Sequence, residues 1–179
     1  MKTCNFEEKN ATRINRKNIL FMNKIILLSF LALCISCNSS AQKKENKSYK
    51  VSKTDVEWKA QLNDLEYYVL RKAGTERQFS SSLNKVYENG TYVCAACETP
   101  LFKVEYKYDS GSGWTSFDRE IKGNVQFSTD RDLGYTRTEE HCATCGGHLG
   151  HVFNDGPKES TGKRHCVNGV SLKFIPENK

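Results

Sequence analysis

The sequence lacks an apolar segment long enough to span a lipid bilayer. Its longest apolar run covers residues 25–35, about half of the roughly 20 residues that a transmembrane helix needs. The run follows Lys24 and precedes a polar stretch, a pattern that is typical of an export signal. We therefore predict a leader over residues 1–41, with Met22 as an alternative start, and an exported protein.

Two candidate cleavage sites predict two forms of that exported protein. Ser36-Cys37 resembles a lipoprotein signal, after which Cys37 would carry a lipid anchor at the membrane, although Cys34 is atypical of such signals. Ser39-Ser40-Ala41 resembles an ordinary signal-peptidase site, which would release a periplasmic protein. Both forms stay open at this point.

The part of the chain that we expect to fold also carries no excess of positive charge. The formal net charge is +6, but the surplus of lysine and arginine lies in the first 53 residues. Residues 54–179 hold 16 basic and 18 acidic side chains. A domain with this balance attracts a phosphate backbone weakly, so nucleic-acid binding is not expected.

Tandem repeats are absent as well, and a single domain is expected. The length of 179 residues suits one domain with a processed segment before it. Residues 42–53 are polar and rich in lysine, which is typical of a flexible linker. We place the domain at residues 54–179.

The pattern within this domain is mainly that of β-strands. Thr54 with Glu57, and Asn63 with Glu66, form capping-box patterns that predict a small helical segment at the start. Short β-like runs separated by turn signals follow over residues 67–71, 92–94, 101–104, 125–128, 134–137, 151–153 and 170–175. The sequence therefore predicts a mostly β fold with antiparallel strands.

Four of the eight cysteines form two CxxC motifs. Cys94 and Cys97 make the first, and Cys142 and Cys145 make the second, with 44 residues between the two motifs. CxxC spacing bends two thiolates toward one ion, and two such motifs complete a tetrahedral site. We favour a metal that joins two distant segments. Two disulfides, or a pair of redox-active dithiols, are the alternatives.

Cys166 is the fifth cysteine of the domain and has no partner in this pattern. An unpaired cysteine in an exported protein is a reactive thiol, an intermolecular bridge or a small buried apolar residue. Arg164 and His165 are its neighbours in the sequence. They are candidate cations that would lower the pKa of the thiol.

Two further features carry candidate site residues. His148 and His151 are candidate proton donors if a turn at Gly150 brings both rings to one site; metal ligation and surface exposure are the alternatives. The Gly-rich loop before Phe117 carries Trp114, which would form one wall of an apolar pocket or pack in the core. This loop lacks the Lys-Ser/Thr ending of a phosphate loop.

Together these residues resemble the methionine-R-sulfoxide reductase family, often called type B. The resemblance covers residues 56–176, nearly the whole predicted domain. It rests on the following motifs in the family's order: Arg71-Lys-Ala-Gly74-Thr75-Glu76, both CxxC motifs, Asp109-Ser-Gly-x-Gly-Trp114, His148-Leu-Gly-His151-Val-Phe, Asp155-Gly-Pro and Thr161-Gly-x-Arg164-x-Cys166-Val-Asn168.

The resemblance implies a fold, a metal and a reaction. The fold is a β-tent of two antiparallel sheets, and the metal is a structural Zn²⁺ held by the four CxxC cysteines. Cys166 is the implied nucleophile, whose thiolate attacks methionine-R-sulfoxide in an oxidised protein or peptide and is left as a sulfenic acid. We expect a monomer.

The resemblance also assigns the supporting residues of this reaction. His148 and His151 would bind or protonate the sulfoxide oxygen. Arg164 and Asn168 would support the nucleophile, and Trp114 and Phe153 would contact the substrate.

Three departures from the family pattern affect these expectations. Ser112 stands where many relatives have a resolving cysteine, so we expect a thioredoxin-like protein or small thiol to reduce Cys166, with Cys37 as the alternative resolving thiol. Thr115 replaces a common proline and is expected to loosen the loop. His165 and Gly169 replace an aromatic residue and a serine that are frequent around the nucleophile. These two replacements affect the expected substrate affinity and the tuning of the Cys166 pKa.

Two alternative functions come from other classes. The first is a binding module, a β domain that is stabilised by zinc and recognises a partner, and it would keep its function without Cys166. A dithiol oxidoreductase predicts redox-active CxxC motifs and no tightly held metal. Only the reductase hypothesis accounts for Cys166, the two histidines and the Trp114 loop together.

Overall fold

The computed structural model describes residues 48–177. The predicted leader, both cleavage sites and Cys37 lie outside these residues, so export and lipid anchoring stay predictions. No helix of residues 48–177 is both long and apolar enough to cross a membrane. The described residues belong to one compact unit, residues 47–179. Val51 is part of this unit, and its N–H donates a hydrogen bond to the carbonyl of Thr144 (3.0 Å). The predicted domain start at residue 54 stays a prediction.

Two helices begin this unit where the capping patterns predict them. α2 spans Asp55–Gln61 and α3 spans Asp64–Lys72. At α2, the side chains of Thr54 and Glu57 each accept a hydrogen bond from the other residue's backbone N–H, and α3 begins with an equivalent capping box. Each box satisfies two N–H groups that the helix itself leaves without partners.

The predicted strand over residues 67–71 is wrong, because these residues belong to α3. Their aromatic and β-branched side chains favour a strand by intrinsic preference. The capping box and the burial of one helix face outweigh that preference, since Val69 and Leu70 are fully buried. α3 therefore packs against β7 (His148–Phe153) and against η3 (Gly169–Ser171), the 3₁₀-helix that follows Cys166.

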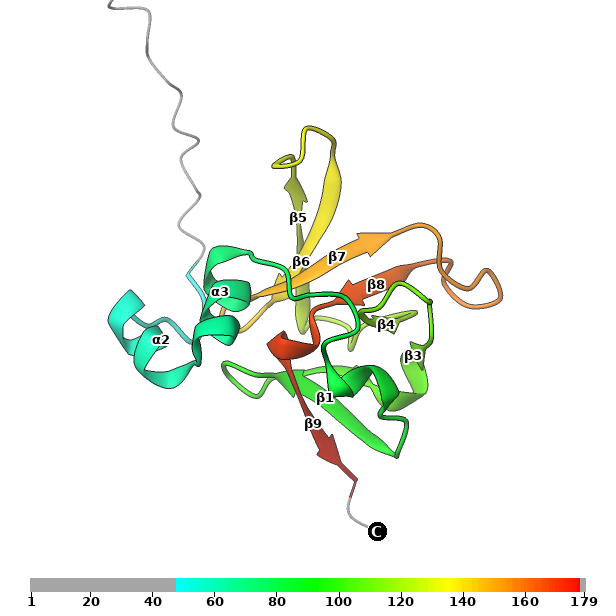
Figure 1. The fold of residues 1–179 in the computed structure, drawn as a ribbon, viewed down its shortest axis with the longest axis horizontal. Helices are drawn as coiled ribbons and strands as arrows, with labels where there is room; N and C mark the ends of the chain where they lie inside the picture. Colours follow the sequence, from blue (N-terminus) through cyan, green and yellow to red (C-terminus); the bar gives the residue numbers. More distant parts are fainter. Residues whose placement is uncertain (1–47, 178–179) are drawn as a thin grey trace, which may run out of the picture. The chain divides into compact units, whose positions relative to one another are not determined.

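The rest of the unit forms two antiparallel sheets, which confirms the predicted fold class. The smaller sheet has the order β2-β1-β9, with strands at Pro100–Lys103, Gly90–Cys94 and Leu172–Pro176. The larger sheet has the order β3-β4-β8-β7-β6-β5 (Figure 1). Its strands are Lys107–Tyr108, Thr115–Phe117, Arg164–Val167, His148–Phe153, Arg137–Cys142 and Val125–Asp130. Two further 3₁₀-helices are η1 (Ser82–Lys85) and η2 (Val104–Tyr106).

Aromatic side chains from both sheets form the centre of the core. Phe102 of β2 stacks on Phe117 of β4, with ring centroids 4.3 Å apart and an interplanar angle of 9°. Tyr92 of β1 meets Phe117 edge to face at 5.0 Å. All three side chains are fully buried, and each such burial stabilises the fold by roughly 1.5–3 kcal/mol. This contact packs the smaller sheet against the larger one.

A bulge in β7, rather than a turn at Gly150, decides how the two histidines are oriented. The consecutive residues Glu140 and His141 of β6 face Gly150 and His148 of β7, so β7 contains one extra residue. An extra residue shifts the alternation of side chains by one position. As a result His148 and His151, three apart in sequence, point to the same face of the sheet.

The sequence analysis predicts neither β4 nor β8. Both are only three or four residues long, and β4 directly follows a Gly-rich segment, so no alternation of apolar and polar residues is visible. β8 carries Cys166 and pairs with β4 on one side and with β7 on the other. The candidate nucleophile therefore lies in the interior of the larger sheet.

Candidate active site

One row of facing residues crosses the larger sheet and includes the candidate nucleophile. Residues that face each other in antiparallel strands place their side chains on the same side of the sheet. The row runs from β4 to β5 through Ser116, Cys166, His151, Glu139 and Ser128. Cys166 therefore has a histidine on one side and a serine on the other.

The rings of the two histidines lie next to each other, and each ring is hydrogen-bonded to a carboxylate. The ring centroids of His148 and His151 lie 5.4 Å apart at an interplanar angle of 65°. Nδ1 of His148 lies 2.7 Å from Oε1 of Glu139, and Nε2 of His151 lies 2.7 Å from Oδ2 of Asp130. The structure thus brings the two predicted histidines together, with His151 on the strand beside Cys166.

Cys166 is partly buried and contacts a serine hydroxyl. Its Sγ lies 3.9 Å from Oγ of Ser112. Burial raises the pKa of the Cys166 thiol above its ordinary value, and the hydrogen bond from Ser112 and the charge of Arg164 oppose this only in part. The resting thiol is therefore mostly protonated at neutral pH, and a reaction there needs a step that favours the thiolate.

Arg164 lies on the same side of β8 as Cys166 and is held in place by two neighbours. Its guanidinium donates to both carboxylate oxygens of Asp155, at 2.8 and 2.9 Å. The guanidinium carbon lies 4.4 Å from the ring centre of Phe153, which faces Arg164 across β7 and β8. Phe153 thus supports the cation beside Cys166.

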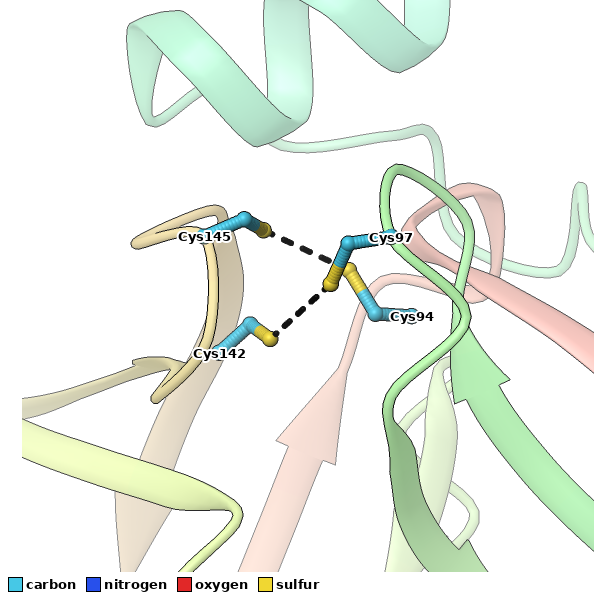
Figure 2. A group of neighbouring side chains, drawn as sticks. All are labelled: Cys94, Cys97, Cys142 and Cys145. Carbon is cyan, nitrogen blue, oxygen red and sulfur yellow. Dashed lines mark hydrogen bonds between the residues drawn. The ribbon is translucent and has the colours of Figure 1, made fainter. Parts of the chain in front are cut away.

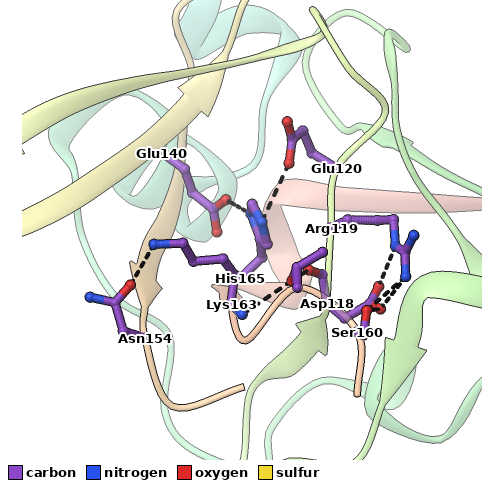
Figure 3. A network of polar contacts seen from close by, with 9 residues as sticks. Asp118, Arg119, Glu120, Glu140, Asn154, Ser160, Lys163 and His165 are labelled. Carbon is purple, nitrogen blue, oxygen red and sulfur yellow. Dashed lines mark hydrogen bonds and ion pairs between the residues drawn. The ribbon is translucent and has the colours of Figure 1, made fainter. Parts of the chain in front are cut away.

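His165 lies on the opposite face of β8, so the expectation that it acts as a cationic neighbour of Cys166 is wrong. Successive strand residues point to opposite sides of a sheet. Figure 3 shows His165 between two carboxylates, with Nδ1 at 2.7 Å from Glu140 and Nε2 at 3.4 Å from Glu120. Burial by itself would lower the pKa of His165, but these carboxylates together raise it.

The loop that carries Trp114 is fixed by hydrogen bonds on both sides of the indole. The indole Nε1–H donates to the carbonyl of Glu76 (3.1 Å). Asn84 donates to the carbonyl of Gly113 (2.9 Å), and its Oδ1 accepts from the hydroxyl of Thr115 (2.8 Å). The expectation that Thr115 loosens this loop is wrong, because its hydroxyl donates a hydrogen bond to Asn84. A proline has no hydroxyl and could not donate this hydrogen bond.

Glu76 is a residue of this site to which the sequence analysis gives no role. It is buried, and its carboxylate accepts from the backbone N–H groups of Gly169 (2.7 Å) and Val170 (2.9 Å). Its own N–H donates to Oδ1 of Asn168 (2.9 Å). Glu76 thus connects the Trp114 loop to the segment after Cys166. Its place in the quoted Arg71–Glu76 motif is the signal that could have pointed to it.

The glycine at position 169 is explained by a serine from another element. A Cβ atom at Gly169 would lie 2.0 Å from Oγ and 2.4 Å from Cβ of Ser81. Ser81 in turn caps η1, because its hydroxyl accepts from the N–H of Leu83 (3.2 Å). The side chain of Ser81 thus occupies the space that a larger residue at position 169 would need.

The four CxxC cysteines form one cluster that joins the two sheets. Cys94 ends β1 of the smaller sheet and Cys142 ends β6 of the larger one. Figure 2 shows two contacts between sulfur atoms of the two motifs, Cys94–Cys145 at 3.7 Å and Cys97–Cys142 at 3.6 Å. All four sulfurs lie within 4.8 Å of one another, so the cluster can hold a metal ion.

The geometry of the cluster fits a metal and not disulfides. A tetrahedral ion with metal–sulfur bonds of about 2.3 Å separates its sulfurs by about 3.8 Å, close to the two distances above. A disulfide needs about 2.05 Å, and all five cysteines of residues 48–177 are free. Hydrogen bonds from neighbouring thiols, with Cys142 first, raise the pKa of Cys94 and lower that of Cys97.

The comparison with known proteins identifies the family. A family model described as the SelR domain matches residues 62–176. This chain belongs to the SelR domain family. Relatives named peptide methionine sulfoxide reductase MsrB from Leptospira interrogans, Leifsonia xyli and Agrobacterium fabrum are 51%, 46% and 48% identical. The alignments cover 73%, 73% and 72% of this chain and 99%, 95% and 96% of the relatives.

The SelR domain match contains every element of the site described above. It begins at Leu62, after α2, and ends at Pro176, the last residue of β9. Both CxxC motifs, the Trp114 loop, the histidine pair and Cys166 lie within it. The site and the cysteine cluster are thus parts of one SelR domain.

Proposed function

We propose that this chain is a peptide-methionine (R)-S-oxide reductase, which converts methionine-R-sulfoxide in oxidised proteins or peptides to methionine. The names and full-length similarity of the relatives support this activity. The observation that carries the proposal for this chain is the row in which Cys166 faces His151 on the neighbouring strand. A soft nucleophile and a proton donor thus lie on one face of the sheet, which is what sulfoxide reduction needs.

The reductase step follows from these positions. The Cys166 thiolate attacks the sulfoxide sulfur, and the sulfoxide oxygen takes a proton from the histidine pair. The products are methionine and a sulfenic acid on Cys166, so the substrate sulfur gains two electrons and Cys166 loses two. Trp114, held by Glu76 and Asn84, provides the apolar wall for the methyl group, and Asn168 and Arg164 support the segment around Cys166.

Regeneration of Cys166 needs an external reductant in this proposal. A thioredoxin-like dithiol attacks the sulfenic acid, releases water and then resolves the mixed disulfide with its second thiol. Ser112, and not a cysteine, is the residue whose side chain contacts Cys166 Sγ. Among residues 48–177 the other four cysteines all belong to the metal cluster.

The metal that we assign to the cluster is Zn²⁺, because four thiolates at tetrahedral spacing are its usual structural ligands. Cys94, Cys97, Cys142 and Cys145 would hold it and join the two sheets. It contributes stability rather than chemistry. No step of the reaction passes through it.

The test uses the purified full-length chain, a dithiol reductant and the separated R and S diastereomers of a blocked methionine sulfoxide. The proposal predicts loss of the R form alone, and no loss in the Cys166→Ser variant. Turnover of neither diastereomer by a folded, metal-loaded protein would contradict the proposal and favour a zinc-stapled binding domain. Turnover that survives in Cys166→Ser would also contradict it.

A further inference from the structure

A cavity of about 420 Å³ lies next to the candidate nucleophile, and its lining includes Ser112 and Arg164. Oγ of Ser112 lies 3.9 Å from Sγ of Cys166. Arg164 precedes Cys166 by two residues on β8, so both side chains point to the same side of the sheet. The charge of Arg164 acts on the Cys166 thiol and lowers its pKa against the effect of burial. The cavity therefore opens beside Cys166.

Tyr108, a further lining residue of this cavity, extends the row of facing residues that contains Cys166. Tyr108 of β3 faces Ser116 of β4, and Ser116 faces Cys166 of β8. Residues that face each other in antiparallel strands share one side of the sheet, so Tyr108 and Cys166 point to the same side. His151 faces Cys166 from β7, the other neighbouring strand. Along this row, Tyr108 and His151 thus lie on opposite sides of Cys166.

The hydroxyl of Tyr108 is buried and has no hydrogen-bond partner in residues 48–177. Burial raises the pKa of this phenol, with the charge of Arg164 acting in the opposite direction, so the hydroxyl keeps its proton at neutral pH. A buried hydroxyl without a partner costs free energy that a polar group of a ligand would recover. The cavity therefore offers a hydrogen-bonding group next to the nucleophile.

The loop of residues 154–163 connects β7 to β8 and forms one wall of the cavity. Asp118 fixes this loop from outside. Figure 3 shows the carboxylate of Asp118 bonded to the hydroxyl of Ser160 and to the guanidinium of Arg119, and this guanidinium also donates to Oγ of Ser160 (2.7 Å). A wall that is already held in place reduces the ordering cost of binding a ligand.

The charged residues that line the cavity are three acids and one base, namely Asp109, Asp155, Glu159 and Arg164. The guanidinium of Arg164 donates to both oxygens of Asp155 and lowers the pKa of that carboxyl. Asp109 accepts the backbone N–H of Gly111 (2.9 Å). Within residues 48–177 neither Asp109 nor Glu159 forms an ion pair. Two carboxylates of the cavity therefore have no counter-charge in the described part of the chain.

The lysines that are closest in sequence are bonded elsewhere or lie outside the cavity. Lys107 donates to the carbonyl of Asn84 (2.8 Å), and Lys163 donates to the side chain of Asn154. Lys158 belongs to the loop but does not line the cavity. A ligand with a positive charge therefore complements the cavity, because binding places opposite charges next to each other.

We infer that this cavity is a subsite for a lysine or arginine side chain next to the oxidised methionine, so that the chain prefers methionine-R-sulfoxide within basic peptide sequences. This inference rests on the proposed reductase function and names its substrate class. The ammonium or guanidinium group of the substrate lies near Asp109 and Glu159 while Cys166 reacts with the sulfoxide. The preference is moderate, because both carboxylates are exposed to solvent.

The test measures single-turnover methionine formation at neutral pH, without any reductant and below saturating peptide. The substrates are blocked pentapeptides with methionine-R-sulfoxide between two identical residues, which are lysine, alanine or glutamate. The wild type is expected to reduce the lysine peptide about 3–10-fold faster than the glutamate peptide, with the alanine peptide between them. Added salt should shrink this preference, because salt screens exposed charges.

Two substitutions remove the unpaired charges and nearly keep the shape of the side chains. Asp109→Asn retains an oxygen that can accept from the N–H of Gly111, and Glu159→Gln is equal in size. The double variant is expected to reduce the lysine and glutamate peptides at nearly equal rates. Glu159→Lys, at an exposed position, is expected to have the same effect and covers the case in which the double variant fails to fold.

Glu105→Gln is the matched control, because it removes one negative charge from η2, where Glu105 pairs with Lys103. It is expected to keep the wild-type preference. Equal rates for all three peptides in the wild type would overturn the inference, and so would a lysine preference that survives both in the double variant and in Glu159→Lys.

Multiple-turnover assays with a thioredoxin as reductant distinguish the substrate from the reductant as the occupant of the cavity. The inference predicts that the substitutions change the peptide preference in the single turnover, before any reductant is present. Substitutions that change only the multiple-turnover rate would show that the cavity receives the reductant, and would overturn the inference. A wild type that reduces none of the peptides would instead contradict the proposed function.

Discussion

Cys166 and His151 face each other on adjacent antiparallel strands, β8 and β7. The pairing places the thiol and one imidazole on the same side of the larger sheet without help from any loop. The bulge in β7 then adds His148 to the same face. Sites built on strands hold their groups more rigidly than sites built on loops. The reacting geometry of this domain is therefore largely fixed by hydrogen-bond register.

The reactivity of Cys166 should increase with pH over the alkaline range. Burial raises the pKa of its thiol while Arg164 lowers it in part, so the midpoint of alkylation is expected above the value of about 8.5 for an exposed cysteine. Arg164→Met removes the positive charge that lowers the pKa of the Cys166 thiol, so the pH midpoint of alkylation should rise further. Iodoacetamide labelling followed by mass spectrometry of the Cys166 peptide measures both. Lys163→Met is the control, since Lys163 bonds Asn154 instead; an alkylation midpoint below pH 7 would contradict the account.

Thr115→Val should weaken both the fold and the binding of substrate. The change removes the hydrogen bond from Thr115 to Asn84 and leaves a partly buried amide oxygen without its donor, which costs about 1 kcal/mol. KM should rise more than kcat falls, because Trp114 is held less firmly next to the change. Urea unfolding and steady-state kinetics measure the two effects. Thr115→Ser keeps the hydroxyl and should behave like the wild type; equal losses in both variants would show that the hydroxyl is not the cause.

Gly169→Ser should destabilise the domain through a clash with one identified side chain. The new Cβ would lie 2.0 Å from Oγ of Ser81, a distance that forces η1 or η3 to move. The second change Ser81→Gly should restore part of the loss, since it opens the occupied space. A double-mutant cycle by thermal or urea unfolding should give a coupling energy of about 0.5–3 kcal/mol. Strictly additive effects would show that these two residues do not compete.

Cys97→Ser should remove the metal and unfold the domain. Structural zinc bound by thiolates contributes on the order of 10 kcal/mol to folding at neutral pH, and the cluster joins β1 to β6. Metal analysis and circular dichroism give the two readouts. Cys166→Ser is the matched control and should keep both the metal and the fold, because Cys166 lies outside the cluster. A folded, metal-free Cys97→Ser protein would refute the structural role.

The fold class and the cysteine cluster could be predicted from the sequence because both depend on local or strongly specific signals. CxxC spacing positions two thiolates by itself, and the structure brings Cys94, Cys97, Cys142 and Cys145 together as predicted. The capping boxes depend on residues three apart in the chain. Both helices accordingly begin where those boxes lie.

The register of the larger sheet could not be predicted, and the errors in the site follow from that. Which way His148 and His151 point depends on a bulge that only the pairing with β6 reveals. The same pairing information separates Arg164, beside Cys166, from His165, which lies on the other face. The role of Glu76 depends on contacts more than 90 residues away in the chain. Sequence periodicity carries none of this information.

The most direct test of the central claim is a single turnover without reductant. The reduced full-length chain is mixed with excess methionine-R-sulfoxide, and methionine and the oxidation state of each cysteine peptide are measured by mass spectrometry. The account predicts about one equivalent of methionine per protein, a sulfenic acid that can be trapped on Cys166, and unmodified cysteines at positions 94, 97, 142 and 145. A disulfide within a CxxC motif, with Cys166 still a thiol, would contradict it.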